Sequence, residues 1–166
     1  MSRSLSRRTH LAILAGLASA LCVLLQGCGQ TPKALAAQMQ TTEKALLALG
    51  TADATVIGKR LSAGRQALLD VVDFMVQAGA QDPNAAYAGS VPYLMLSGNL
   101  MAGWQMARAL LAAQNELTAG HDAEFMQSKI ATCRFYADHI LSRVPGMRDG
   151  IVEGADSVTA LALEAF

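Results

Sequence analysis

The stretch from Val91 to Gln114 constrains the fold of this chain most, because it is apolar on two sides when wound as a helix. Its polar side chains Ser97, Gln105 and Arg108 share one narrow arc at about 100° per residue, and only Asn99 falls opposite. The two apolar faces consist of Leu96, Leu100, Trp104, Ala107 and Leu111, and of Met95, Ala102, Met106, Leu110 and Ala113. A helix with two apolar faces needs neighbours on two sides, so this stretch is predicted to be the central helix of a bundle.

The same stretch could be placed in a membrane or in a protein core. As a helix it is almost long enough to span a bilayer. Arg108, together with Gln105 and Asn99, disfavours a membrane span, because polar groups are costly in hydrocarbon. The small residues Gly98, Ala102 and Gly103 instead predict a close crossing with another helix.

The composition favours one helical domain. The chain has 166 residues, enough for a single domain with a modest core. It is 52% hydrophobic and only 5% aromatic, and its abundance of alanine and leucine favours helices over strands. Thirteen basic and thirteen acidic residues cancel, so the basic surface of a nucleic-acid binder is missing and no nucleic acid is expected as a partner.

The segment 1–28 has the pattern of an export signal. Arg3, Arg7 and Arg8 precede the uncharged apolar run Leu11–Leu25. The tetrad that ends at Cys28, Leu-Gln-Gly-Cys, resembles the bacterial lipoprotein box, in which the cysteine is lipidated and becomes the first residue of the mature protein. Residues 1–28 are therefore predicted to be a lipoprotein signal peptide with Cys28 as the lipidation site, which gives a lipid-anchored protein of the cell envelope.

A second origin of this leader stays open. A misassigned start codon or a fused reading frame can supply an alanine- and leucine-rich segment by chance. The gene is then a fragment, and the chain is expected in the cytoplasm. Residues 29–33 form a short polar linker in either case.

Two helices are predicted before the central one. Apolar residues recur at helical spacing from Ala34 until Gly50 ends the run. Asp53 is predicted to cap a second helix that continues to about Ala80. The apolar face of that helix consists of Ile57, Leu61, Leu68, Val72 and Met75.

The beginning of the central helix has two alternatives. Residues 82–84, Asp-Pro-Asn, are typical of a turn. Ser90 is a good N-cap, with Pro92 tolerated in the first turn. Alternatively, the helix begins near Ala85 and kinks at Pro92. Residues 115–121 are predicted to form the loop after it.

A fourth helix is predicted from the cap Asp122 to Pro145-Gly146. One apolar arc consists of Phe125, Met126, Ile130, Cys133, Tyr136, Ala137, Ile140, Leu141 and Val144. Phe135 lies outside this arc among polar residues, so it is expected to be exposed and is a candidate partner contact. Trp104 is a candidate packing or interface residue on the central helix.

The sequence contains no pattern typical of catalysis, metal binding or cofactor binding. His10, His121 and His139 have no second ligand or catalytic partner at an interpretable spacing. The core-facing Glu-x-x-His pairs of di-metal bundles do not occur. Cys133 falls inside the apolar arc and is predicted to be a small buried hydrophobe.

Several separated blocks of residues point to a known family. They are residues 82–85 (Asp-Pro-Asn-Ala), 88–94 (Ala-Gly-Ser-Val-Pro-Tyr-Leu), 103–109 (Gly-Trp-Gln-Met-Ala-Arg-Ala), 129–132, 134–137 and 154–158. In this order the blocks resemble the helical C-terminal extension of a subgroup of bacterial acyl-CoA dehydrogenases. The resemblance covers residues 34–166, which are therefore expected to form one domain.

The resemblance implies a domain without an active site of its own. In those flavoenzymes the flavin site, the acyl-CoA pocket and the glutamate base belong to upstream domains, which this sequence lacks. No catalytic or flavin-binding residue can be transferred to it, and activity would require a separately encoded core. Because such domains pack on the enzyme's helical region and contribute to its assembly, a dehydrogenase core or a second copy is the expected partner.

The predicted fold is therefore all-α, an antiparallel bundle of four helices with a short C-terminal helical tail. The predicted function is that of a non-catalytic accessory or interaction domain. The alternative is a cell-envelope lipoprotein whose bundle binds a partner or a small apolar ligand.

Overall fold

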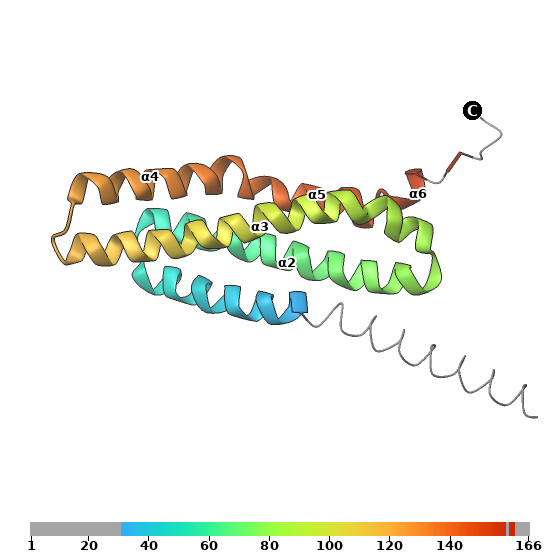
Figure 1. The fold of residues 1–166 in the computed structure, drawn as a ribbon, viewed down its shortest axis with the longest axis horizontal. Helices are drawn as coiled ribbons and strands as arrows, with labels where there is room; N and C mark the ends of the chain where they lie inside the picture. Colours follow the sequence, from blue (N-terminus) through green and yellow to red (C-terminus); the bar gives the residue numbers. More distant parts are fainter. Residues whose placement is uncertain (1–30, 159, 162–166) are drawn as a thin grey trace, which may run out of the picture.

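The computed structural model describes residues 31–158 and 160–161, which form an up-down-up-down bundle (Figure 1). Residues 31–49 form the first helix of the described part. It is followed by α2 (Ala52–Gln81), α3 (Pro83–Thr118), α4 (Ala123–His139), the 3-10 turn η1 (Leu141–Arg143), α5 (Val144–Val152) and α6 (Ala155–Val158). No strand occurs in these residues, so the predicted all-α bundle with a short helical tail is confirmed.

Helix α3 is the central helix, as predicted. It packs against α2, α4 and α5, and α6 contacts its first half. Leu96, Leu100 and Leu110 on α3 are fully buried. Met95 is an exception to the predicted faces, because it is half exposed on a side of α3 that no described element covers.

The cap of α3 lies earlier than Ser90. The Asp82 carboxylate accepts hydrogen bonds from the backbone N–H groups of Asn84 and Ala85, at 3.1 and 3.4 Å. The helix therefore begins at Pro83, and Pro92 lies inside it rather than in its first turn. Of the two predicted starts, the one near Ala85 is closer to the observed start at Pro83. A side-chain cap and a proline in the first turn stabilise a helix that begins at this position.

Other helix boundaries and caps also differ from the predicted ones. Thr51, not Asp53, caps α2: its hydroxyl accepts from the N–H of Ala54 at 3.3 Å. The loop predicted at residues 115–121 is shorter, since α3 continues to Thr118. Asp122 does stand at the N-cap position of α4, but its side chain makes no capping hydrogen bond and its φ is +38°.

The predicted fourth helix is broken in two. It ends at His139, and after η1 the chain resumes as α5 with Pro145 in the first turn. Pro145 therefore begins a helix instead of ending one, because a proline has no N–H to lose at that position. Phe125, predicted in the buried arc, is half exposed near the free end of α4.

Two polar contacts attach helix 31–49 to the rest of the bundle. The Trp104 indole N–H donates to the Thr42 hydroxyl at 2.8 Å, and both residues are buried. The Arg65 guanidinium donates to both carboxylate oxygens of Glu43, at 2.7 and 3.2 Å. Because Thr42 contacts α3 and Glu43 contacts α2, the pair fixes where helix 31–49 lies along both helices.

Glycines permit close packing at the centre. A Cβ added to Gly103 would lie 2.7 Å from Leu141, and one added to Gly64 would lie 2.8 Å from Leu100. The close crossing predicted at Gly103 is therefore confirmed. Gly98 takes no part in it, because a Cβ there would meet no described atom within 4 Å.

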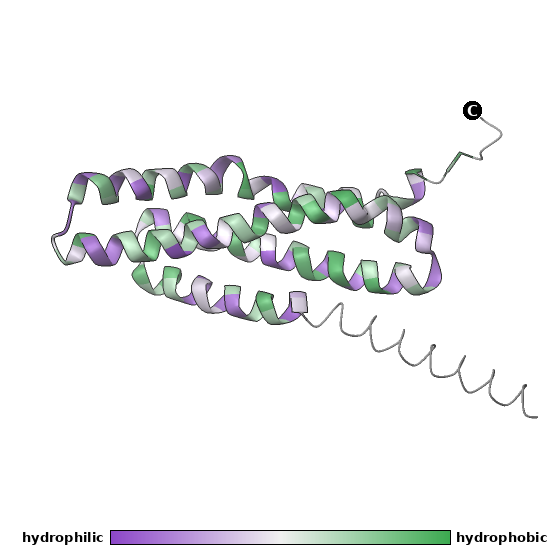
Figure 2. Cartoon of the chain, in the orientation of Figure 1, coloured by the Kyte–Doolittle hydropathy of each residue, from purple (hydrophilic) through white to green (hydrophobic). Residues whose placement is uncertain are grey.

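The helices are amphipathic rather than uniformly apolar, as the alternation of hydropathy along them shows (Figure 2). A search of the described residues finds no helix long and apolar enough to cross a membrane. Cys28 and the candidate leader lie outside the described residues, so lipidation and the location in the envelope or the cytoplasm stay predictions.

Replacing Trp104 tests the central position of α3. We expect Trp104→Ala to lower the free energy of unfolding by about 3–5 kcal/mol, because a large buried side chain is lost. Trp104→Phe keeps a ring but removes the donor to Thr42, and a loss of about 1 kcal/mol is expected. Urea titrations followed by circular dichroism measure both. Equal stability of Trp104→Ala and the natural chain would contradict this packing.

Candidate interaction surface

The described residues offer little for catalysis or metal binding. No group of three or more His, Cys, Asp or Glu side chains among them could hold a metal ion. His121 is exposed and lies 2.8 Å from the Glu116 carboxylate. His139 is exposed beside the ring of Phe135, with ring centroids 4.5 Å apart.

An exposed apolar stripe runs along the first half of α3. Tyr87, Val91 and Leu94 are 73%, 69% and 71% exposed, and Met95 lies beside them. Tyr87, Val91 and Leu94 recur every three or four positions, and Met95 follows Val91 by four, so all of them lie on one side of the helix. No residue from 84 to 107 carries a charge. We call these four residues the α3 stripe.

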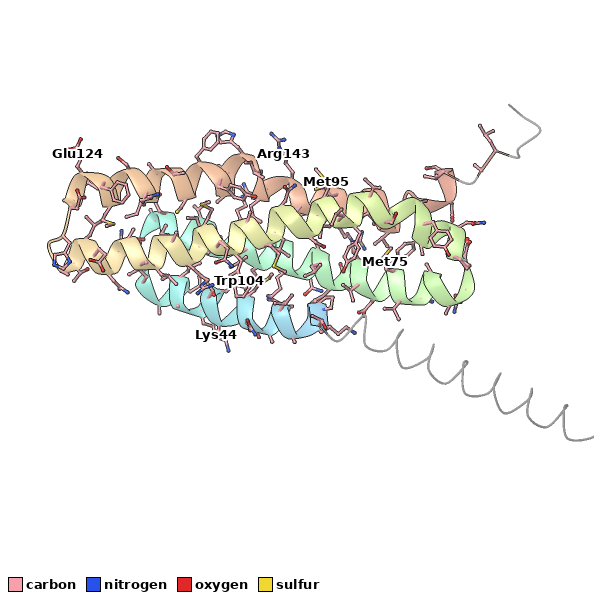
Figure 3. All side chains as sticks on the ribbon, in the orientation of Figure 1. Lys44, Met75, Met95, Trp104, Glu124 and Arg143 are labelled. Atoms are coloured by element: carbon pink, nitrogen blue, oxygen red, sulfur yellow. The ribbon has the colours of Figure 1, made fainter. Side chains whose placement is uncertain are left out.

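The α3 stripe is larger than scattered exposed residues would explain. Single exposed apolar side chains are normal on protein surfaces, but contiguous ones mark interaction sites. Met95, labelled in Figure 3, is 55% exposed. Sequence reasoning misses this surface, because Tyr87 joins it only if the helix begins before Ser90, and because Met95 is predicted on an inner face.

An apolar groove adjoins the stripe between α2 and α3. Its volume is about 360 Å³. It is lined by Val72, Met75 and Val76 from α2 and by Ala86, Tyr87, Ser90 and Tyr93 from α3. Tyr87 belongs to both features, at the edge that they share. We call it the α2–α3 groove.

A cleft of about 580 Å³ with mixed polar and apolar walls lies at the other end of the bundle, where Gln114, Ile130 and Arg134 are among its lining residues. The Arg134 guanidinium donates to Asp138 at 2.7 Å and to Asp53 at 3.0 Å. These hydrogen bonds, the one to Asp138 foremost, raise the pKa of Arg134. With two carboxylates on the guanidinium, the cleft lacks the free positive charge that an anion would require.

The two predicted contact residues have different surroundings. Phe135 is 59% exposed on α4, in agreement with its position outside the apolar arc. Trp104 is buried between α3 and helix 31–49, so it packs within the chain. The structure does not bring them together, and a partner contact at Phe135 stays a prediction.

Cys133 lies in the core, as predicted. Burial raises the pKa of its thiol, and the positive charge of Lys129 lowers it by a smaller amount. The thiol therefore stays protonated at pH values where an exposed cysteine would begin to ionise. This is the opposite of the electropositive, accessible setting that activates a nucleophilic cysteine.

Comparison with known proteins assigns the chain to a protein family. Residues 35–162 match the family model described as acetyl-CoA dehydrogenase C-terminal like. The chain belongs to this family. The match includes all of α2 to α5, and with them the α3 stripe and the α2–α3 groove.

One relative is the 3-methylmercaptopropionyl-CoA dehydrogenase of Ruegeria pomeroyi. It is 41% identical over 140 residues, which cover 84% of this chain and 24% of the relative. The chain thus spans about a quarter of the length of the enzyme it matches. No solved structure matches the chain.

The protected state of Cys133 can be measured by alkylation. In a Cys22→Ala, Cys28→Ala variant at pH 8, we expect iodoacetamide to react at least about tenfold more slowly with the native protein than with the urea-unfolded protein. The reason is that burial blocks access and disfavours the thiolate. Mass spectrometry over time gives both rates, and equal rates would show that Cys133 is accessible.

Proposed function

We propose that this chain is a non-catalytic helical accessory domain that packs on an acyl-CoA dehydrogenase core through the α3 stripe. The observation that carries the proposal is the exposure of Tyr87, Val91 and Leu94 on one side of a helix segment without charge. Membership of the family supplies the class of partner, since the relative contains about three quarters of its length outside the matched region.

The physical reason for docking is the apolar area that the stripe leaves in water. Covering a large apolar side chain stabilises a complex by about 1.5–3 kcal/mol, before the loss of motional freedom on association. Three or four such side chains form an adequate centre for an interface. The absence of charge from 84 to 107 also means that no ionised group on this side of the helix has to be desolvated.

The chain would then contribute by binding to the dehydrogenase core and would not catalyse a reaction itself. It would cover and order a surface of the dehydrogenase core, and the core would supply the flavin, the acyl-CoA pocket and the base. Self-association through the same stripe is the competing use of this surface, and a binding experiment distinguishes the two.

Binding to a core tests the proposal. The core is the Ruegeria pomeroyi relative expressed without its C-terminal quarter, and the full chain carries an affinity tag. We expect the two to co-purify. Leu94→Glu and Val91→Glu should each weaken binding by about tenfold or more, because a charge would be placed at the centre of the interface. Biolayer interferometry gives the dissociation constants.

The matched control is Ala63→Glu, at an exposed position on α2 away from the stripe. It should bind the core as tightly as the natural chain does. Thermal melts should show that all three variants keep their stability, because the altered positions are exposed. Binding that survives Leu94→Glu, or a tagged chain that captures only further copies of itself, would contradict docking on a core.

The non-catalytic part of the proposal has its own test. The chain alone is expected to leave the FAD absorption spectrum unchanged and to give no acyl-CoA oxidation with an artificial electron acceptor. A purified chain that is yellow, or that turns over an acyl-CoA, would show that it holds an active site.

A further inference from the structure

The α2–α3 groove has room for a large apolar side chain. Its volume is about 360 Å³. Since an apolar cavity of about 150 Å³ is enough to hold a benzene ring, a leucine or phenylalanine side chain fits in the groove. The mouth of the groove is open, because Val76 on the α2 wall and Tyr87 and Ser90 on the α3 wall are exposed. A side chain of another molecule can therefore enter it.

The lining of the groove favours an uncharged occupant. None of the seven described residues that line it carries a charge. The Ser90 hydroxyl already donates a hydrogen bond to the Tyr87 carbonyl, at 2.8 Å. The α2 wall consists of the apolar side chains Val72, Met75 and Val76. A charged side chain would lose its water there without gaining a partner, whereas covering these walls with an apolar side chain is favourable.

The groove and the α3 stripe form one continuous apolar surface. Tyr87 lines the groove and belongs to the stripe. Ser90 in the groove wall is followed directly by Val91 in the stripe. A molecule that covers the stripe thus also reaches the edge of the groove. Interfaces have their strongest contacts where a side chain of one partner fills a pocket of the other, so the groove is the place to expect such a contact.

The family indicates where a dehydrogenase core is attached to a domain of this kind. The matched region is described as C-terminal, and about three quarters of the Ruegeria pomeroyi relative lie outside the match. In that relative, the core therefore precedes the position that corresponds to residue 35 of this chain.

Helix 31–49 begins next to the groove. Lys33 Nζ lies 2.7 Å from Asp73 Oδ1. On α2, Asp73 directly follows Val72 and precedes Val76 by about one turn, and both valines line the groove. The helix thus starts beside the second half of α2 (Figure 1). With the same fold in the relative, a core that is joined ahead of this helix meets the bundle on the side of the groove.

These observations assign an occupant to the groove: we propose that it receives a large apolar side chain, a leucine or a phenylalanine, from the surface of the dehydrogenase core. The inference rests on the proposed function, because it names the contact that anchors the same complex. The α3 stripe supplies apolar area over a broad part of the interface. The groove determines how the two partners are aligned, since a side chain can enter it in only one alignment of the two surfaces.

Photo-crosslinking tests this contact in the full chain with its shape unchanged. All methionines are replaced by photo-methionine, a diazirine analogue of nearly the same size. Met75 lies in the groove wall and Met95 in the stripe, so each feature carries a probe (Figure 3). The chain is irradiated with the unlabelled Ruegeria pomeroyi relative that lacks its C-terminal quarter. Peptide mass spectrometry should find cross-links to this core from both methionines.

Met126 is the internal control for the cross-linking. It is partly buried, as Met75 is, but it lies on α4 near the other end of the bundle. We expect no cross-link from Met126 to the core. The residue of the core that is joined to Met75 should lie next to a leucine or phenylalanine, and this identifies the side chain that enters the groove.

A filled groove gives a second measurement. Val76→Trp adds an indole at the α2 wall and leaves the α3 stripe intact. We expect the dissociation constant for the core to rise by about tenfold or more, because the groove is then blocked. The matched control is Ala63→Trp, which adds the same ring at an exposed position of α2 outside the groove and should bind as the natural chain does. Thermal melts should show that both variants stay folded.

Different results separate this contact from docking as such. A natural chain that does not bind the core would contradict both the proposed function and this inference. Binding that is weakened by Leu94→Glu but not by Val76→Trp would overturn the groove contact alone, and so would cross-links from Met95 without any from Met75. Cross-links from Met75 to a second copy, to residues 1–30 or to a co-purified lipid in place of the core would give the groove another occupant and would overturn it too.

Discussion

The need to cover α3 determines the arrangement of the other helices. Leu96, Leu100 and Leu110 are fully buried, and the segment from 84 to 107 has no charge that water could solvate. Helix α2, helix 31–49 and the column made of α4 and α5 each cover part of its circumference. The fold is thus an apolar helix surrounded on three sides, and what remains open on the fourth side is the α3 stripe. The candidate interaction surface is a direct consequence of this helix being apolar on more sides than the domain can cover.

The buried polar groups give this apolar packing a single register. Apolar contacts are non-directional, and a helix held by them alone could slide along its neighbours. The Thr42 hydroxyl on the Trp104 indole and the Glu43 carboxylate on the Arg65 guanidinium remove that freedom, because any other register would bury these groups without partners. Both contacts come from adjacent residues of helix 31–49, so a single turn determines its position against two helices.

Much of the fold can be predicted from periodicity, whereas the interaction surface cannot. The spacing of Ile57, Leu61 and Leu68 is enough to predict α2, and the family blocks predict the domain. Periodicity shows which residues share a side but not which sides have a neighbour. Met95 and Phe125 are for this reason predicted in the core, yet both are half exposed. Local signals also compete, because Ser90 and Asp82 are both good caps. The packing of residues 85 and 86 against α6 and α2 adds to the Asp82 cap and to the proline in the first turn, and the helix begins at the earlier position.

The turn at Asp82 has a mechanical consequence. One residue closes α2, through its N–H on the carbonyl of Ala78, and opens α3, through its carboxylate. Because the turn consists of this single residue, the end of α2 and the beginning of α3 cannot move apart or slide along each other. The α2–α3 groove between them is consequently preformed.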